Sequence, residues 1–245
     1  MLPCAAVSLL ELRGLGKRFG AVRALRGVDL TVEAGEVVGL MGDNGAGKST
    51  LLEIVAGSHA PSEGELRLAA EPVRLAGPAD ARARGIEAVH QDLALCPNLS
   101  AAENVFLGRE LVRRGRLERR AMDARTRELF AELKAEVEPG ARVRTLSGGQ
   151  RQAVAIARAL RARARLMLLD EPTAAIGVAQ VAEVLGLVRR LRERGVGVVL
   201  VSHRMQDVFA VADRLVVLRR GQKVADTPIA RSSFQEATAF ITGAR

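Results

Sequence analysis

Residues 42–50 read GDNGAGKST, and this segment constrains the fold more than any other part of the chain. An apolar run of strand length, EVVGLM, precedes it at 36–41, and a helix-forming segment follows it at 49–56. In a loop of the pattern G-x-x-x-x-G-K-[ST], successive backbone N–H groups form a concave anion site, and the next helix points its positive end at the anion. Lys48 adds a mobile charge, and the Ser49 hydroxyl can bind Mg²⁺. The segment therefore predicts a phosphate-binding loop between a strand and a helix.

Chance alone rarely produces this loop. The chain has 24 glycines, four lysines and 17 serines and threonines, which gives about 0.003 expected matches over its length. A glycine-rich turn that only caps a helix is the structural alternative.

Short apolar runs alternate with segments of helical periodicity along the rest of the chain, which is typical of an α/β protein. Helices are expected at 150–164 and over 181–191, where valines and leucines recur at helical spacing. The apolar runs predict further strands at residues 8–12, 28–32, 87–90, 166–169, 196–201 and 214–218, with a polar turn at 14–20.

Residues 93–146 are expected to be mainly helical, without a strand of their own. Ser100 and Glu103 form the pattern of a capping box that opens a helix. A second helix is indicated by four apolar residues on one face, Met122, Leu129, Phe130 and Leu133. We therefore expect a single domain over residues 1–245, with a core at 1–92 and 147–245 and an inserted helical subdomain at 93–146.

Four apolar runs end in residues that can do chemistry. They lead into the phosphate loop, into Gln91, into Asp170 and Glu171, and into Ser202 and His203. In an open parallel sheet, ligands bind beyond the carboxyl ends of the strands, so these residues are expected to meet at one edge.

The adjacent acids Asp170 and Glu171 lie at a strand end, so the period-2 backbone should point them in different directions. One can then hold the Mg²⁺ shell while the other faces an attacking water. His203 is suited to contact a γ-phosphate. The alternatives are two acids that only solubilise the end of a strand, a satisfied core histidine, and an ordinary exposed glutamine at position 91.

A second anion site is indicated at LSGGQ, residues 146–150, which precedes a long helical segment. Ser147 is a good N-cap, and Gly148 and Gly149 expose backbone N–H groups at the positive end of that helix. Taken alone, this segment is only a capped helix.

The order of these motifs resembles that of the ATP-binding subunits of ABC transporters, and the resemblance covers nearly the whole chain. It implies a P-loop NTPase core with a mixed sheet, a small N-terminal β-subdomain and the inserted helical subdomain. It also implies a head-to-tail dimer that holds two ATP molecules between its subunits, each with Mg²⁺. In that dimer, Ser147, Gly148, Gly149 and Gln150 would contact the γ-phosphate bound by the partner.

The resemblance also implies roles for other residues. Glu171 would be the catalytic base and His203 the γ-phosphate sensor, while Phe19 would stack on adenine. Gln91 would link Mg²⁺ and water to the surface that contacts the membrane subunits, and Ser49, Gln91 and Asp170 would hold the metal. The expected phosphate-binding residues are Gly42, Asp43, Asn44, Gly45, Ala46, Gly47, Lys48, Ser49 and Thr50.

Finer details resemble the importers of simple sugars of the ribose, xylose and fructose type. They are GDNGAGKST from Gly42, VHQDLALCPNLSAAENVFLGRE from Val89, DEPTAAIGV from Asp170 and SHRMQDVFAVADRLVVLRRG from Ser202. This likeness implies a homodimer on the cytoplasmic face of the cell membrane, bound to integral-membrane permease subunits and served by an extracytoplasmic sugar-binding protein. Most of the wider family has Leu-Asp where this chain has Ile176-Gly177, and the sugar importers lack that Asp as well. Asp92 stands where Glu is usual and keeps the charge.

The sequence argues against a membrane-spanning protein, a protein with a cleaved signal peptide and a disulfide-rich protein. No apolar stretch reaches the length of about 18–20 residues that a membrane-spanning helix needs, and the N-terminal sequence lacks the basic start of a cleaved signal peptide. Cys4 and Cys96 do not make a disulfide framework, which favours a reducing cytosol. The net charge is +9, yet the chain has no Trp or Tyr and six Phe, so base-stacking platforms are scarce.

We therefore expect no nucleic-acid partner. The densest basic stretch, residues 109–120, is expected to be a solvated helical face. The alternative function is a soluble ABC-type ATPase that acts on nucleic acid or the ribosome. A small-molecule kinase is a second rival, but it leaves LSGGQ unexplained.

Overall fold

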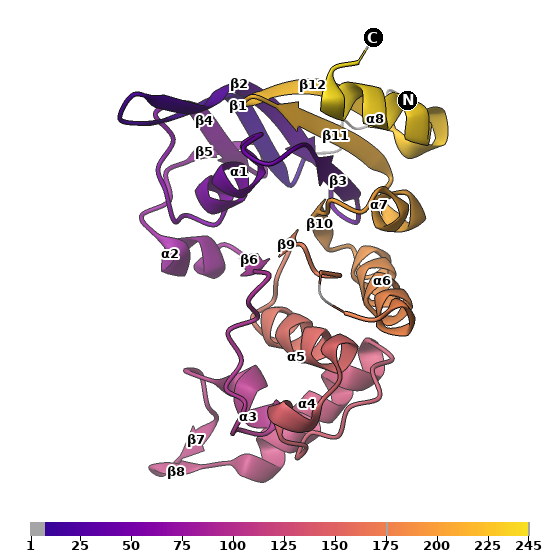
Figure 1. The fold of residues 1–245 in the computed structure, drawn as a ribbon. Helices are drawn as coiled ribbons and strands as arrows, with labels where there is room; N and C mark the ends of the chain where they lie inside the picture. The colour runs from indigo at the N-terminus through magenta and orange to yellow at the C-terminus, as the bar shows by residue number, and fades with distance from the viewer. Residues whose placement is uncertain (1–7, 175, 245) are drawn as a thin grey trace, which may run out of the picture.

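The structure is a computed structural model, and it describes residues 8–174 and 176–244. A six-stranded sheet in the order β12-β11-β3-β10-β9-β6 lies at its centre (Figure 1). The five strands from β11 to β6 are parallel to their neighbours, and β12 is antiparallel to β11. The mixed sheet of the predicted α/β class is therefore confirmed. Its strands are β3 (Val37–Met41), β6 (Ile86–Val89), β9 (Leu166–Asp170), β10 (Gly197–Val201), β11 (Arg214–Arg219) and β12 (Gln222–Pro228).

A second, antiparallel sheet in the order β2-β1-β4-β5 forms the N-terminal β-subdomain. Its strands are β1 (Leu10–Phe19), β2 (Val22–Val32), β4 (Glu63–Leu68) and β5 (Glu71–Val73). The predicted polar turn at 14–20 is wrong, because β1 continues through it. Gly14 has φ +57 and lies at a register shift between Leu12 and Leu15, so a bulge absorbs the polar residues without ending the strand.

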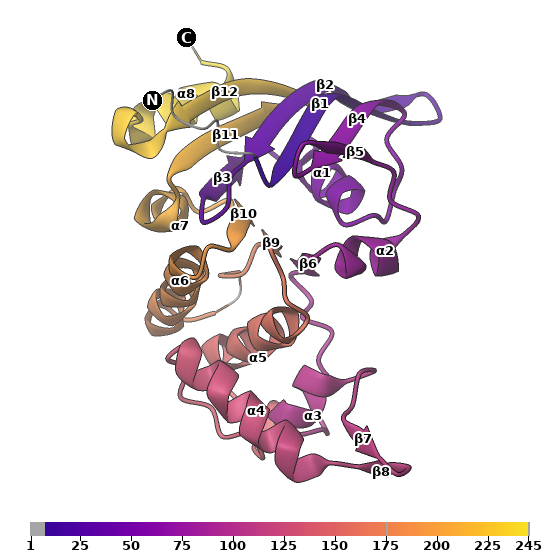
Figure 2. The ribbon, with the colours of Figure 1, turned by 180° about the vertical axis from the view of Figure 1, so that it is seen from behind.

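The central strands are buried on both faces, which explains their nearly continuous apolar sequences. In β9, Leu166 and Leu168 pack into one core cluster, and Met167 and Leu169 pack into another. Figures 1 and 2 place α1 and α2 on one side of the strands and α6 and α7 on the other. The helices are α1 (Lys48–Val55), α2 (Pro78–Ala83), α3 (Ala101–Phe106), α4 (Arg119–Glu132), α5 (Gly148–Arg161), α6 (Val178–Glu193), α7 (Met205–Val211) and α8 (Phe234–Thr242).

The segment 93–146 holds α3 and α4, but fewer than half of its residues are helical, and the prediction that it holds no strand is also wrong. A small hairpin joins β7 (Val112–Arg113) to β8 (Arg116–Leu117). Arg114 and Gly115 both have positive φ, as a two-residue hairpin turn requires. Strands of two residues are too short to show a period, so the sequence pattern could not reveal them. The basic stretch 109–120 is solvated as expected, yet it forms this hairpin rather than a helical face.

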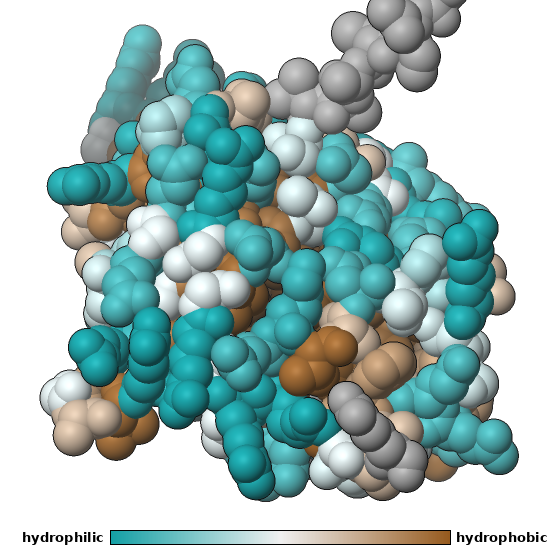
Figure 3. Space-filling view, turned by 90° about the horizontal axis from the view of Figure 1, so that it is seen from above, coloured by the Kyte–Doolittle hydropathy of each residue, from teal (hydrophilic) through white to brown (hydrophobic). Residues whose placement is uncertain are grey.

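The two helices predicted for this segment are confirmed. Ser100 and Glu103 form the reciprocal capping box at the start of α3, and the four apolar residues of the predicted face are buried. Hydrophilic side chains cover most of the face in Figure 3, with small, scattered hydrophobic patches between them. In the described ranges, no helix combines the length and apolar character needed to cross a membrane. Cys96 forms no disulfide with another described residue, and Cys4 lies outside them.

Candidate functional site

The phosphate loop follows β3 and packs closely against β11 and β2. Gly42 has φ +152, and a Cβ there would lie under 3.0 Å from the carbonyl oxygen of Leu218 on β11. Gly47 has φ +105, and its Cβ would lie 2.7 Å from Leu25 Cδ2 on β2. The N–H of Gly221, in the β11–β12 turn, donates to the carbonyl of Ala46 at 3.0 Å. These glycines are therefore required by close backbone packing and by their dihedral angles.

The first turn of α1 is open to an anion. No side chain caps its N-terminus and no acidic residue lies in its first turn, so its free N–H groups face outward. Lys48 Nζ donates to the carbonyls of Gly42 at 2.7 Å and Asp43 at 3.0 Å, which folds the ammonium group over the loop. Ser49 is exposed beside it. An uncapped helix end with an adjacent lysine and hydroxyl fits a phosphate group with its metal ion.

The predicted strand ends meet at one edge of the sheet. In the parallel order, β10 lies between β3 and β9, and β6 lies beside β9. The residues after these strands therefore emerge on the same side as the phosphate loop. Asp170 is the last residue of β9, whereas Glu171 lies in the following turn with φ +51. The alternation expected from a strand thus stops at Asp170, because the chain turns there.

Glu171 and His203 form a direct side-chain contact. His203 Nδ1 lies 2.7 Å from Glu171 Oε2, and the tautomer of the imidazole decides whether Nδ1 carries the hydrogen. The Glu171 side chain is 16% exposed and that of His203 is 65% exposed, so the glutamate is sheltered and the histidine faces solvent. The N–H of Glu171 also donates to the Val201 carbonyl at 2.9 Å. Two strand ends thereby place a carboxylate and an imidazole together at the edge of the site.

Asp170 is a partly buried carboxyl beside Glu171. Burial raises the pKa of its carboxyl, and the neighbouring Glu171 raises that pKa further, while His90 and Lys48 partly oppose the effect. A desolvated pair of carboxylates is stabilised by a divalent ion. No cluster of three or more His, Cys, Asp or Glu side chains among the described residues could hold one. The donor set for Mg²⁺ would therefore be mixed, with hydroxyl, amide and phosphate oxygens beside one carboxylate.

The LSGGQ segment begins α5 with a complete capping box. The Ser147 N–H donates to Gln150 Oε1 at 2.9 Å, and the Gln150 N–H donates to Ser147 Oγ at 3.2 Å. Gln150 Nε2 donates in addition to the Glu136 carbonyl at 2.9 Å. Ser147 is the predicted cap, whereas the reciprocal bond from Gln150 was not predicted, although Ser-x-x-Gln is its pattern.

The two glycines of LSGGQ also leave room for side chains of α6. A Cβ at Gly148 would lie 2.7 Å from Gln180 Oε1, and one at Gly149 would lie under 3.0 Å from Glu183 Oε2, both on α6. Figures 1 and 2 place α5 well apart from α1, so one chain does not bring its own LSGGQ to its phosphate loop.

Known proteins share this arrangement of motifs. A model of the family described as "ABC transporter" matches residues 25–174. The chain belongs to the ABC transporter family.

Relatives of this ABC cassette include two sugar-import proteins. A ribose import ATP-binding protein of Burkholderia mallei is 45% identical over 97% of this chain and 47% of its own length. A xylose/arabinose import ATP-binding protein of Sulfolobus acidocaldarius is 43% identical over 96% of this chain and 94% of its own length. The chain spans about half the length, or less, of the ribose import relatives that it matches.

Solved structures agree on the fold. A nucleotide-free ATP-binding cassette from an ABC transporter superposes with a TM-score of 0.80 at 24% identity, over 96% of this chain and 95% of that one. A dimeric ATP-binding cassette in a post-hydrolysis state, bound to ADP and Pi, gives a TM-score of 0.75 at 30% identity, over 91% of this chain and all of that one. The predicted family and fold are therefore confirmed, and the chain is a nucleotide-binding cassette.

Two further predicted residues of the cassette lie at its surface. Phe19 is 42% exposed near the β1–β2 turn. Its ring meets His59 edge-on at 5.2 Å and lies 5.0 Å from Lys17 Nζ. Gln91 is exposed after β6 and lines a groove of about 360 Å³ with Gly148. Both positions are compatible with contacts to a ligand or a partner. Ala175, beside the Ile176-Gly177 departure, lies outside the described residues.

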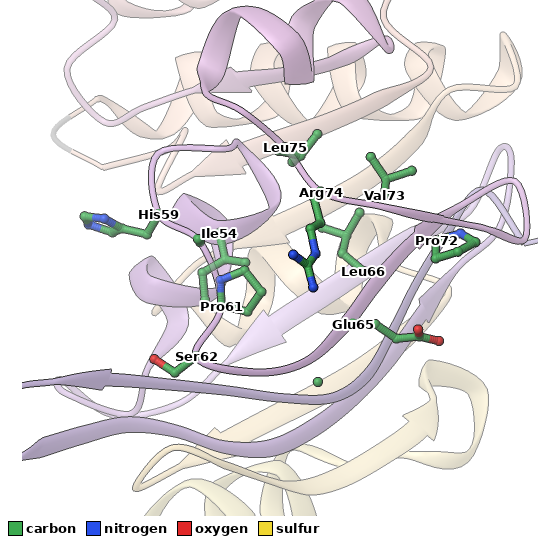
Figure 4. A pocket seen from close by; sticks show the side chains of 12 residues that line it. Ile54, His59, Pro61, Ser62, Glu65, Leu66, Pro72, Val73, Arg74 and Leu75 are labelled. Atoms are coloured by element: carbon green, nitrogen blue, oxygen red, sulfur yellow. The ribbon is translucent and has the colours of Figure 1, made fainter.

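The cassette also has a larger cavity, of about 780 Å³, between β4, β5 and the segment after α1 (Figure 4). Arg74 points into it among apolar side chains, whereas His59 points away. None of the predicted site residues lines it. Predicted site residues line smaller grooves instead, Asp43–Ala46 in one and Gln91 with Gly148 in another.

Proposed function

We propose that this cassette binds and hydrolyses ATP with Mg²⁺, and that hydrolysis energises the import of a sugar. The observation that carries the hydrolytic part is the contact between Glu171 and His203 beside the phosphate loop. A sheltered carboxylate at this edge can accept a proton from a water that attacks the γ-phosphate. The proposal of sugar import is supported by the relatives, whose names specify ribose or xylose and arabinose import.

Each residue of the site has its own role in the proposed reaction. The backbone N–H groups of residues 42–50 and the Lys48 ammonium bind the phosphates. Mg²⁺ would be held by Ser49, Gln91 and Asp170, and when bound it neutralises charge on the phosphate oxygens. Glu171 takes the proton from the water as the bond from the γ-phosphorus to the ADP oxygen breaks. His203 fixes the Glu171 carboxylate and presents its other ring nitrogen toward the γ-phosphate.

A second copy of the chain completes the site. In the proposed homodimer, Ser147, Gly148, Gly149 and Gln150 cover the phosphates bound by the partner, and Phe19 stacks on the adenine. The dimeric state of a cassette 30% identical to this one supports this arrangement. The separation of α5 from α1 within one chain supports it as well, because the α5 end is left for another molecule.

We also propose that residues 1–92 and 147–245 act as the nucleotide-binding core and residues 93–146 as a helical subdomain. The dimer would sit on the cytoplasmic face of the membrane, where Gln91 lies near the surface that contacts separate permease subunits. An extracytoplasmic sugar-binding protein would deliver the sugar.

Phosphate release by the purified chain tests the hydrolytic part. We expect Mg²⁺-dependent release that Lys48→Ala lowers by about a hundredfold or more, since it removes the charge at the phosphates. Arg127→Ala, at an exposed arginine on α4, also removes one positive charge and should keep the wild-type rate. A phosphorylated small molecule in place of free phosphate would identify a kinase instead.

Reconstitution tests the transport part. The chain, co-purified with its membrane partner into liposomes, should show ATPase activity that rises when a binding protein loaded with a pentose or hexose is added. Salt-sensitive binding to nucleic acid, with no response to sugar, would favour the alternative of a soluble ATPase that acts on nucleic acid or the ribosome.

A further inference from the structure

The turn that carries Glu171 is attached to three different elements at three successive residues. The Glu171 N–H donates to the Val201 carbonyl at the end of β10 at 2.9 Å. The Pro172 carbonyl accepts a hydrogen bond of 2.8 Å from Gln152 Nε2 on α5. Thr173 Oγ1 donates to Asp207 Oδ2 on α7 at 2.6 Å. The position of the turn therefore depends on α5, β10 and α7 together.

The side chains that hold the turn are buried. Thr173 and Asp207 are each 2% exposed, and Gln152 is 5% exposed. These three residues make up half of the six fully buried polar or charged residues in the described part of the chain. Burying a carboxylate, a hydroxyl and an amide is unfavourable unless each finds partners. Their concentration around one short turn indicates that the turn needs a fixed position.

The backbone of Glu171 explains this need. Its φ is +51, a left-handed conformation that is strained for a side chain larger than glycine. At a turn that carries a functional side chain, the surrounding bonds can hold such a conformation in place. Without the bonds to Pro172 and Thr173, the turn could relax and move the Glu171 carboxylate away from His203.

The hydrogen-bond network of Gln152, Thr173 and Asp207 includes two helices that begin close to proposed site residues. Asp207 lies on the helix that follows His203, and Arg204 Nε lies 3.5 Å from its Oδ2. Gln152 lies on α5, the helix that LSGGQ begins. Its Oε1 is buried without a hydrogen-bond partner among the described residues, and it lines the groove that also contains Gln91 and Gly148. A displacement of α5 would therefore reach the Glu171 turn directly through Gln152.

We propose that Gln152, Thr173 and Asp207 are positioning residues for the catalytic glutamate, and that Gln152 makes the alignment of Glu171 depend on the seating of α5. This inference rests on the proposed function. When the LSGGQ end of α5 contacts the nucleotide bound by the partner, the position of α5 becomes fixed. The bond from Gln152 to the Pro172 carbonyl then aligns Glu171 in the same chain as that α5. The network acts through Glu171 and does not itself contact the nucleotide.

The test uses Thr173→Val in the full-length chain, because valine keeps the shape of threonine and removes only the hydroxyl. The matched control is Thr126→Val on α4, since Thr126 is fully buried and its hydroxyl has no partner among the described residues. The measurements are kcat, KM and the thermal midpoint, with ATP affinity determined by equilibrium binding.

We expect Thr173→Val to lower kcat about tenfold or more, as a displaced catalytic group does, with the ATP affinity unchanged within about twofold. Thr173→Ser should restore kcat, because it restores the hydroxyl. Gln152→Met should lower kcat in the same way, and Thr126→Val should leave it unchanged. Because Thr173 and Asp207 share one bond, Thr173→Val combined with Asp207→Asn should cost no more than the worse single change.

Three results would overturn the inference. One is a wild-type kcat in both Thr173→Val and Gln152→Met. Another is a decrease in kcat of Thr173→Val that comes with equal losses of ATP affinity and thermal midpoint, or a decrease that Thr173→Ser shares. Either result would show a purely structural role for Thr173. A wild-type chain that releases no phosphate overturns the proposed function and this inference with it, whereas an active wild type beside fully active variants overturns the inference alone.

Discussion

His203 Nδ1 lies 2.7 Å from Glu171 Oε2, so the imidazole and the carboxylate form a pair. The carboxylate comes from the turn after β9 and the imidazole from the end of β10, and neighbouring strands fix the spacing between them. The pair is therefore a property of the fold.

His203→Ala should lower kcat about a hundredfold, because it frees the Glu171 carboxylate and removes the group facing the γ-phosphate. ATP affinity should change by less than about threefold, since the phosphate loop is untouched. Replacing His59, which contacts Phe19 and lies away from Glu171, with Ala provides the comparison and should keep kcat near the wild-type value. Equal losses in the two variants would contradict the pairing.

Replacing Asp170 should change how the free energy of unfolding depends on pH. Burial and then Glu171 raise the pKa of this carboxyl above its ordinary value of 3.8, so the native state binds the proton more tightly than the unfolded state does. This contribution to stability is complete below the ordinary value and is lost as the pH rises through the raised native pKa. Asp170→Asn removes the charge and should flatten that decline.

Thermal unfolding at several pH values measures this effect. At neutral pH and without Mg²⁺, Asp170→Asn should unfold at a higher temperature than the wild type, because the desolvated charge is removed. With Mg²⁺ and ATP, the order should reverse, because only the wild type gains from the cation. Asp123→Asn on α4 is the control, and a lower midpoint for Asp170→Asn at neutral pH without ligand would contradict the assignment.

The glycines of the phosphate loop should differ in their tolerance of alanine. A Cβ at Gly42 collides with the Leu218 carbonyl, whereas one at Gly45 meets nothing within 4 Å. Gly42→Ala should therefore lower the unfolding free energy by about 2–4 kcal/mol and abolish ATP binding. Gly45→Ala, at φ +75, should cost only about 1 kcal/mol. Chemical denaturation of both variants compares them, and equal losses would contradict the packing argument.

Local patterns predicted most of the fold because the central strands are buried on both faces and read as apolar runs. The same strand ends predicted where Gln91, Asp170, Glu171 and His203 emerge, since parallel strands bring their carboxyl ends to one edge. The prediction failed where neighbours decide the conformation. The bulge at Gly14 and the left-handed turn at Glu171 depend on contacts with Asp29 and Val201, which lie far along the chain.

The buried network around Thr173 was also invisible in the sequence. Thr173, Gln152 and Asp207 are ordinary polar residues on three separate elements, and nothing in their local patterns marks them as buried. Only the packing of α5 and α7 against the turn brings them together. The predicted roles of Phe19, Gln91 and residues 147–150 stay predictions, because they concern a nucleotide and a second chain.

The central claim is that ATP is cleaved by Glu171 only after a second copy closes over it. Size-exclusion chromatography of Glu171→Gln with ATP and Mg²⁺, combined with phosphate release, tests it most directly. We predict that the variant binds ATP like the wild type, elutes as a dimer with ATP trapped inside, and releases phosphate at least about a hundredfold more slowly. Rapid phosphate release by the variant, or a monomer that never traps ATP, would contradict the account.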